Sequence, residues 1–329
     1  MILLNDRFCV RLFSLAGLML LSSVGLSDDA KSAAETTESG ASEQEYVRIR
    51  RSEKRTAQAL ETSIVRLGES RKYPGATVDL IGAIHLGENQ YYETLNRQFR
   101  QYDVLLFEAV MPERAVRMGL RPGGGKGSKR ILDPDQQWSE AKVGLQAVSV
   151  LQLGMKDVLG LDFQLSAVDY TVDNFVHADM TQEEFESCMA RRGETFTGIL
   201  AQEMVKATLE QQKHNPVAQQ LDVVLSLLAS DRIYRLRRLA AVELTKANAG
   251  TAFGGVDGTS TIITERNRRA LEVLKEQLQK NVRNIGIFYG AGHFPDMEKR
   301  MVEDFGFRRV GESWLTAWHL TAPETSTDK

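Results

Sequence analysis

The chain has 329 residues, 42% of them apolar and 26% charged, with a formal net charge of −3 at pH 7. Proteins that bind nucleic acids normally carry a surplus of basic residues, and this chain has none. The composition is that of a globular protein and argues against a nucleic-acid partner, and the length suits one large α/β domain or two small ones.

The first 27 residues have the pattern of a secretory signal peptide. Arg7 and Arg11 precede the apolar stretch 12–26, and small residues then lead into two aspartates. A basic start, a short apolar core and small residues at the exit are typical of exported proteins. The alternative is an uncleaved N-terminal membrane anchor, although the stretch is shorter than the ~20 residues that span a bilayer. We expect cleavage near Ser27, a secreted or periplasmic location and no integral membrane span in the mature chain.

The remaining chain predicts a single domain. Residues 28–45 are polar and rich in Ser, Thr and Glu, which predicts a disordered leader. The α/β domain is assigned to residues 46–323, followed by a short tail at 324–329. Cys188 is the only cysteine left after signal cleavage, so no intramolecular disulfide can form, and we interpret it as a small buried hydrophobe.

A β–turn–α–β unit opens the structured part, which we expect to begin at Thr62. The run 77–84 (TVDLIGAI) is short and rich in β-branched and aliphatic residues, which predicts a buried strand. A helix from Glu88 places three apolar side chains on one face at four-residue spacing: Tyr91, Leu95 and Phe99. A second strand over 104–110 follows at once and is expected to adjoin the first in parallel orientation.

The far end of the chain repeats this design. Residues 284–289 (NIGIFY) predict a strand, 290–293 a turn, and Pro295 suits the start of a helix that runs to about Asp304. Closing strands are expected over 307–320. The two units predict an α/β fold with a central mixed or mostly parallel sheet, and they leave the strand order open.

The middle of the chain is mainly helical. The pattern over residues 135–281 predicts a helical insertion or cap packed beside the sheet. Thr181 and Glu184 match a capping box at the start of one of these helices. The glycine- and lysine-rich segment 119–130 is expected to be a mobile or ligand-facing loop.

Two of the five histidines, His85 and His293, end matched glycine turns. The segments 82–85 (GAIH) and 290–293 (GAGH) each follow a predicted buried strand and precede a helix. Ligands bind at this edge of open α/β sheets, where glycine allows a tight turn. Glu108 ends the adjoining strand among apolar residues, and an unpartnered buried carboxylate is costly. A divalent ion would satisfy the two imidazoles and the carboxylate together, and a cationic side chain would satisfy the carboxylate alone.

These segments resemble the TraB/PrgY/GumN family, which is related to the Tiki proteases. The similarity rests on LIGAIHLG at 80–87, YDVLLFE at 102–108 and GAGH at 290–293. Arg266 and Asn267 are similar to an Arg-Asn pair that the family carries on a helix before the final strand.

The resemblance extends over residues 64–320 and implies a sheet-centred α/β fold shared with erythromycin-esterase-like and heme-binding ChaN-like proteins. In the Tiki branch, the positions that match His85, Glu108 and His293 are associated with divalent-metal-dependent peptide cleavage. The resemblance therefore implies an exported hydrolase that holds Mn, Co or Zn and acts on a peptide or small-molecule substrate. The chain lacks the H-E-x-x-H helix of common zinc proteases.

The resemblance also suggests a role for each residue. His85 and His293 would bind the metal, and Glu108 would be a third ligand or the general base that acts on water. Arg266 would hold a substrate carboxylate or an oxyanion, and Asn267 would orient the site by hydrogen bonds. Two alternatives stay open. One is a metal-free, esterase-like hydrolase with a histidine as base, and the other is a non-catalytic protein that sequesters a peptide, heme or iron.

Three further polar residues have simpler interpretations. His177 and Asp179 would point the same way only in an extended segment, so we assign them a capping or structural role rather than metal binding. His319, on a terminal strand, is also interpreted as structural. The sequence leaves the substrate, the identity of the metal and the oligomeric state open.

Overall fold

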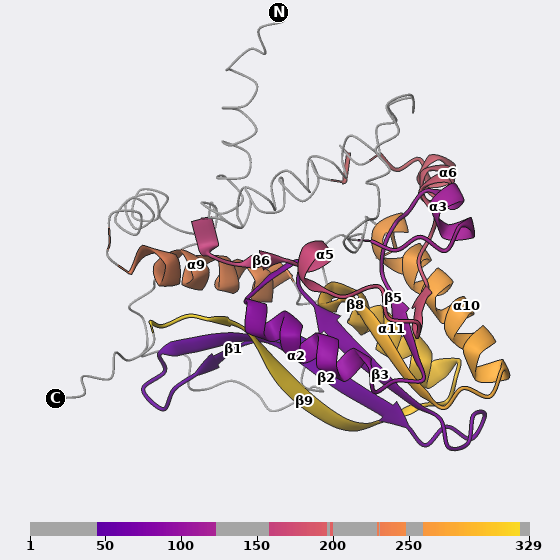
Figure 1. Ribbon diagram of the computed structural model, residues 1–329, viewed down its shortest axis with the longest axis horizontal. Helices are drawn as coiled ribbons and strands as arrows, with labels where there is room; N and C mark the ends of the chain where they lie inside the picture. The colour runs from indigo at the N-terminus through magenta and orange to yellow at the C-terminus, as the bar shows by residue number, and fades with distance from the viewer. Residues whose placement is uncertain are drawn as a thin grey trace, which may run out of the picture.

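The computed structural model describes residues 45–122, 158–195, 198–199, 229, 231–247 and 259–322. An α/β fold is confirmed, with a seven-stranded mixed sheet and helices packed around it (Figure 1). The signal peptide, nearly all of the polar leader, most of the glycine-rich loop, the C-terminal tail and much of the predicted helical block lie outside the described residues. None of the described helices is long and apolar enough to cross a bilayer.

The elements follow one another along the chain in the order that Figure 1 labels. The large sheet contains β1 (Val47–Arg51), β2 (Ala57–Gly68), β3 (Thr77–Ala83), β5 (Val104–Phe107), β7 (Phe175–His177), β8 (Asn284–Gly290) and β9 (Arg308–His319). A second, two-stranded sheet is formed by β4 (Leu86–Gly87) and β6 (Asp162–Phe163). The helices are α2 (Asn89–Phe99), α3 (Glu113–Arg117), α5 (Gln164–Ala167), α6 (Gln182–Arg192), α9 (Arg232–Ala247), α10 (Arg266–Gln279) and α11 (Phe294–Glu303). A π-helical turn η1 (Thr261–Glu265) precedes α10, and a 3-10 turn η2 (Ala291–His293) precedes α11.

The parallel part of the sheet has the order β3-β8-β5-β7. Both β–turn–α–β units are present, but the expectation that the first two predicted strands adjoin is wrong, because β8 lies between β3 and β5. The five central residues of β8 are all buried, and a strand buried on both faces needs a hydrogen-bonding neighbour at each edge. The insertion brings the carboxyl ends of β3, β8 and β5 together in that order.

The antiparallel part of the sheet is longer than the sequence predicted. Structure begins with β1 and with β2 at Ala57, before the expected start at Thr62, and β9 is one strand of twelve residues. β1 and β3 pair with successive halves of one edge of β2, and β9 pairs along the other edge. The first half of β2 was missed because it carries the polar Glu61, which is buried and paired with Arg48 and Arg50 of β1.

The described helices occupy different ends of the sheet. α10 packs on β5 and α11, whereas α9 packs on β1 and β9 at the far side of the molecule (Figure 1). The capping box at Thr181 is confirmed, and it starts α6, which ends at Gly193 in a left-handed conformation with φ of 65°. Cys188 of α6 is buried, as expected, in a small apolar cluster separate from the main core.

Candidate active site

The residues predicted to form the site come from three neighbouring strand ends. His85 follows β3 by two residues, Glu108 directly follows β5, and His293 ends the η2 turn after β8. The predicted strand 104–110 stops at Phe107, so Glu108 stands just beyond the sheet. Carboxyl ends of parallel strands form the usual ligand-binding edge of an open α/β sheet.

Glu108 is held by the protein through both carboxylate oxygens. Its Oε1 accepts a hydrogen bond from Arg266 Nη2 at 2.7 Å, and its Oε2 accepts the Gly290 N–H at 2.6 Å. A Cβ atom at position 290 would lie 3.3 Å from Oε2, so the glycine makes this close approach possible. Burial raises the pKa of Glu108, but the charges of Arg266, His293 and His85 outweigh it and lower the pKa. Glu108 is therefore an ionised carboxylate at neutral pH.

Arg266 lies between two carboxylates. Its Nε and Nη2 donate to Asp179 Oδ1 and Oδ2 at 2.9 and 2.5 Å, and Nη2 also reaches Glu108. Burial lowers the pKa of Arg266, but Asp179 and Glu108 raise it well above its usual value. Only Nη1 has no described partner, so the guanidinium is mainly an internal counter-ion. The π-helical turn η1 places this residue at the start of α10, and such turns are frequent at functional sites.

The imidazole of His293 has a fixed orientation. Asn267 Nδ2 donates to the His293 carbonyl at 2.9 Å and to Asp296 Oδ2 at 2.8 Å, which identifies Oδ1 as its acceptor. His293 Nδ1 lies 2.6 Å from Oδ1 and must therefore carry the ring proton. The unprotonated Nε2 faces Glu108 Oε1 at 3.7 Å. Burial lowers the pKa of His293 to about 4 against the opposing charge of Glu108, so the pair is not an ion pair at neutral pH.

His85 differs from His293 because its side chain is exposed. It makes no side-chain hydrogen bond or ion pair with the described residues, and its carbonyl accepts the Gln164 N–H at 2.9 Å. It follows the end of β3, which is separated from the end of β5 by β8 alone, and it contributes to the lowered pKa of Glu108. We call the group formed by Glu108, Arg266, Asp179, His293, Asn267 and the neighbouring His85 the Glu108 cluster.

Asp179 is the member of the Glu108 cluster that the sequence analysis left with a structural role. Its side chain is fully buried and ion-paired with Arg266. The sequence contained a signal for a site role of Asp179. Like Glu108, Asp179 is a carboxylate between apolar residues, here Ala178 and Met180. His177 is not a member, since its Nε2 lies 2.7 Å from the Ala109 carbonyl and fixes the backbone beside Glu108.

The chemistry of the Glu108 cluster suits a cation, although a metal site is not preformed. Two carboxylates face one guanidinium, which leaves one net negative charge, and uncompensated buried charge is costly. The Nε2 lone pair and an ionised oxygen face each other with no proton between them. In the described part of the chain, no three His, Cys, Asp or Glu side chains are already arranged around a metal position. His293 and Glu108 supply two donors, and His85 is the candidate for a third.

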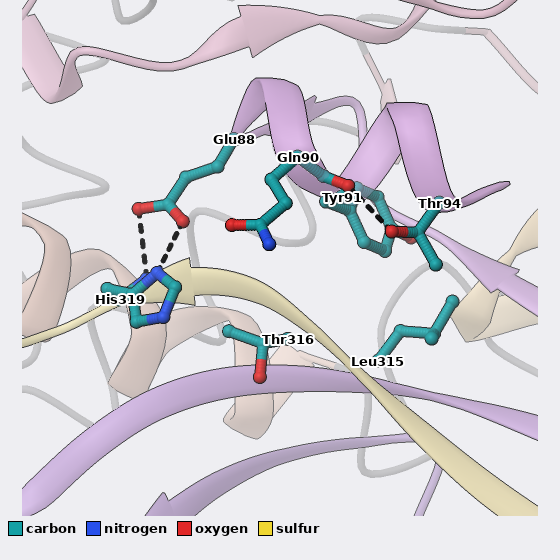
Figure 2. A pocket seen from close by; sticks show the side chains of 7 residues that line it. All are labelled: Glu88, Gln90, Tyr91, Thr94, Leu315, Thr316 and His319. Carbon is teal, nitrogen blue, oxygen red and sulfur yellow. Dashed lines mark hydrogen bonds and ion pairs between the residues drawn. The ribbon is translucent and has the colours of Figure 1, made fainter. Parts of the chain in front are cut away.

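A hollow of about 230 Å³ lies elsewhere, between α2 and the end of β9 (Figure 2). It is lined by Glu88, Gln90, Tyr91, Thr94, Leu315, Thr316 and His319, and includes no member of the Glu108 cluster. His319 is exposed and faces Glu88 across one end of the hollow.

Comparisons of the chain with family models, with curated proteins and with solved structures find no match. The resemblance to TraB/PrgY/GumN sequences therefore rests on the motif residues alone. Any function for the chain has to be inferred from what the side chains of the Glu108 cluster can do.

Proposed function

We propose that this chain is an exported hydrolase that uses the Glu108 cluster to hold a divalent ion and to cleave peptide bonds. The observation that carries the proposal is the contact between His293 and Glu108. An unprotonated imidazole nitrogen faces an ionised carboxylate oxygen at 3.7 Å, so a cation placed beside this pair would find a donor atom on each side chain. The peptide substrate is taken from the resemblance to the Tiki branch.

The donor set fits Mn, Co or Zn in its chemistry. His293 and His85 offer neutral imidazole nitrogens, Glu108 offers a carboxylate oxygen, and the cluster has one negative charge to be compensated. A metal-binding histidine usually donates its other ring N–H to a fixed acceptor, and Asn267 supplies that acceptor for His293. A bound divalent ion would supply a Lewis acid that activates water and polarises the scissile carbonyl.

The protein's own groups have distinct tasks in this proposal. Glu108, ionised at neutral pH, is either a ligand of the ion or the general base that accepts a proton from the attacking water. Arg266 keeps Glu108 ionised and in place, and Asp179 holds Arg266. The Nη1 group of Arg266 is the part left to donate to a substrate oxygen. Asn267 fixes the His293 ring so that Nε2 is directed into the site.

Metal content tests the proposal directly. The purified chain is incubated separately with Mn, Co or Zn, dialysed, and compared with His293→Ala, Glu108→Gln and His85→Ala. We expect a near-stoichiometric ion in the wild type and its loss in His293→Ala and Glu108→Gln, whereas His319→Ala, outside the cluster, retains it. A panel of synthetic peptides then gives products by mass spectrometry only with the ion present. Unchanged metal content in both His293→Ala and Glu108→Gln would refute the assignment.

A metal-free hydrolase is the second candidate, and one observation favours it. Both oxygens of Glu108 already accept hydrogen bonds from the protein, so the carboxylate is satisfied as it stands. In that case His293 Nε2 is the general base, and Glu108 stabilises the imidazolium that forms. Peptide or ester hydrolysis that persists in excess chelator and disappears in His293→Ala would establish this mechanism. Saturable binding of a peptide, heme or iron without product would instead indicate a sequestering protein.

A further inference from the structure

The hollow between α2 and β9 has a charged pair fixed at one end. Figure 2 shows Glu88 and His319 facing each other there, with Gln90 and Thr94 along α2 and Thr316 on β9. His319 Nδ1 lies 2.5 Å from Glu88 Oε2, and the His319 N–H donates to Glu88 Oε1 at 3.1 Å. The carboxylate thus holds both the ring and the backbone of the same histidine.

Glu88 is itself anchored from the opposite side by Arg237 of α9. Arg237 is buried, and its Nη1 donates to Glu88 Oε1 at 2.5 Å. Nη1 also donates to the His319 carbonyl at 3.1 Å, and Nε and Nη2 donate to the carbonyls of Leu159 at 2.8 Å and Gly160 at 2.9 Å. Burial raises the pKa of Glu88, but His319 and Arg237 outweigh it and lower the pKa. The negative charge of Glu88 is therefore compensated by an internal cation and is not free for a ligand.

The orientation of His319 follows from these contacts. Because Nδ1 faces a carboxylate oxygen, it carries a proton, and in the ring form with a single proton the lone pair lies on Nε2. The ring is exposed, and Nε2 has no described partner. It is therefore an open hydrogen-bond acceptor beside the hollow.

The other groups along the hollow are neutral and polar. The Thr316 hydroxyl and the Gln90 amide make no hydrogen bond to any described side chain or backbone group, and each can donate and accept. Thr94 donates to the Gln90 carbonyl at 2.9 Å and accepts from Arg97 Nη2 at 3.0 Å, so its hydroxyl is already engaged by the protein. Leu315 and the buried ring of Tyr91 supply apolar wall. At about 230 Å³, the hollow is smaller than the ~300 Å³ at which sites for drug-sized ligands begin.

We propose that this hollow is a binding site for a small, neutral, hydroxyl-bearing molecule, of the chemical class of a polyol or monosaccharide. A ligand hydroxyl donates to His319 Nε2, and neighbouring ligand hydroxyls exchange hydrogen bonds with Thr316 and Gln90. The carboxylate of Glu88 adjoins the site and disfavours binding of an anion. A cation is not favoured either, because the negative charge of Glu88 is already compensated by Arg237. The site is independent of the Glu108 cluster and of whether that cluster is catalytic.

Ring NMR spectra of the purified chain test this assignment with D-glucose and glycerol as probes. The chain has five histidines, so a saturable shift confined to His319 identifies the place of binding. We expect such a shift with D-glucose, and a dissociation constant weakened about 2- to 10-fold in Thr316→Val, as for loss of one hydrogen bond. Thr321→Val removes a hydroxyl from the same chain segment outside the hollow and should leave the constant unchanged.

Three results would overturn the proposal. The first is no saturable His319 shift with either probe up to its solubility limit. The second is a shift with acetate or phosphate but not with D-glucose, which would make the site an anion site. The third is a D-glucose shift of equal affinity in Thr316→Val and the wild type, which would place the ligand outside the hollow. Thr316→Val is suited to this test because valine favours a β-strand, so folding should be retained.

Discussion

Two parts of this molecule use the same three residue types in opposite arrangements. The Glu108 cluster contains Glu108, His293 and Arg266, and the group beside the hollow, here the Glu88 cluster, contains Glu88, His319 and Arg237. In each, an arginine with little solvent exposure donates to one glutamate oxygen. The histidine rings differ. Nδ1 of His319 donates directly to its glutamate, whereas Nδ1 of His293 donates to Asn267.

This difference decides where each histidine presents its lone pair. In the Glu88 cluster the proton lies between histidine and glutamate, and Nε2 is left for the hollow. In the Glu108 cluster Nε2 faces the glutamate itself, so the pair lacks a proton or cation between its atoms. The same composition therefore gives a hydrogen-bonded pair with an open acceptor in one place and, in the other, a histidine and a glutamate that face each other without a shared proton. The second arrangement suits activation of a water molecule or binding of an ion.

Replacing the two arginines tests how much each cluster depends on its cation. Arg266→Met leaves Glu108 and Asp179 without a counter-ion in a buried place, which should lower the free energy of unfolding by about 3–5 kcal/mol. Urea unfolding of the wild type and the variant measures this. Arg268→Met on the same helix removes only exposed pairs with Glu265 and Glu272 and should cost ~1 kcal/mol or less. Equal losses in the two variants would contradict the description of Arg266 as the internal counter-ion.

Acid should destabilise the protein through His293. Its pKa is about 4 in the folded chain, below the ordinary value of 6.5. Between these values the unfolded chain binds more protons, so stability is complete above pH 6.5 and declines as the pH falls towards 4. The decline attributable to His293 is at most about 3.5 kcal/mol, since one pKa unit corresponds to ~1.4 kcal/mol.

Comparison with His293→Gln isolates this effect. Unfolding free energies are measured for both proteins at several pH values between 4 and 6.5, and the variant should show the shallower slope. Glu108 adds a decline of the same sign at lower pH, because its folded pKa is also lowered and its stabilisation disappears on protonation. If the two slopes coincide above pH 4, His293 is not held neutral by burial.

The Glu88 cluster should be less sensitive to loss of its arginine. Arg237→Met removes four hydrogen bonds but leaves Glu88 its contacts with His319 and partial access to water, so we expect a loss of about 2 kcal/mol. Arg235→Met on the same helix loses only an exposed pair with Asp231 and should change stability by less than ~1 kcal/mol. A loss for Arg237→Met as large as that for Arg266→Met would mean that both clusters depend equally on their cations.

The sequence predicted the parallel strands better than the antiparallel ones, for physical reasons. β3 and β8 are buried on both faces, and β8 appears as a continuous apolar run. β3 does so after Asp79, which is buried and paired with Arg66 of β2. β2 is also buried but contains Glu61, whose burial is possible only because Arg48 and Arg50 of β1 reach it. A pairing between side chains on two strands has no signature in either strand alone, so the start of the sheet was placed too late.

For the candidate site, the sequence indicated the strand-end residues and missed the contacts among them. The glycine turns indicated His85 and His293 as candidate site residues, and the apolar neighbours of Glu108 in the sequence indicated that residue. Asp179 was interpreted as a structural residue. Its ion-pair partner Arg266 is 87 residues away in the chain, so the sequence around Asp179 does not reveal the pairing. The orientation of a histidine ring depends on such distant partners, which is why His293 and His319 could not be distinguished in this respect from sequence.

The smallest expected change, in the ring of His319, tests that orientation directly. Glu88→Gln keeps the shape of the side chain but removes the charge that holds the proton on Nδ1, so we expect a mixture of ring tautomers. The cost in stability should be about 2 kcal/mol or less, because the glutamine oxygen can still accept from Arg237 but no longer compensates its charge. Nitrogen-15 shifts of the imidazole groups report the tautomers, and His293 in the same spectrum is the internal control, since Asn267 still holds its Nδ1 proton. If His319 kept its proton on Nδ1 in Glu88→Gln, the backbone and not the carboxylate would orient the ring, and the contrast between the two clusters would lose its basis.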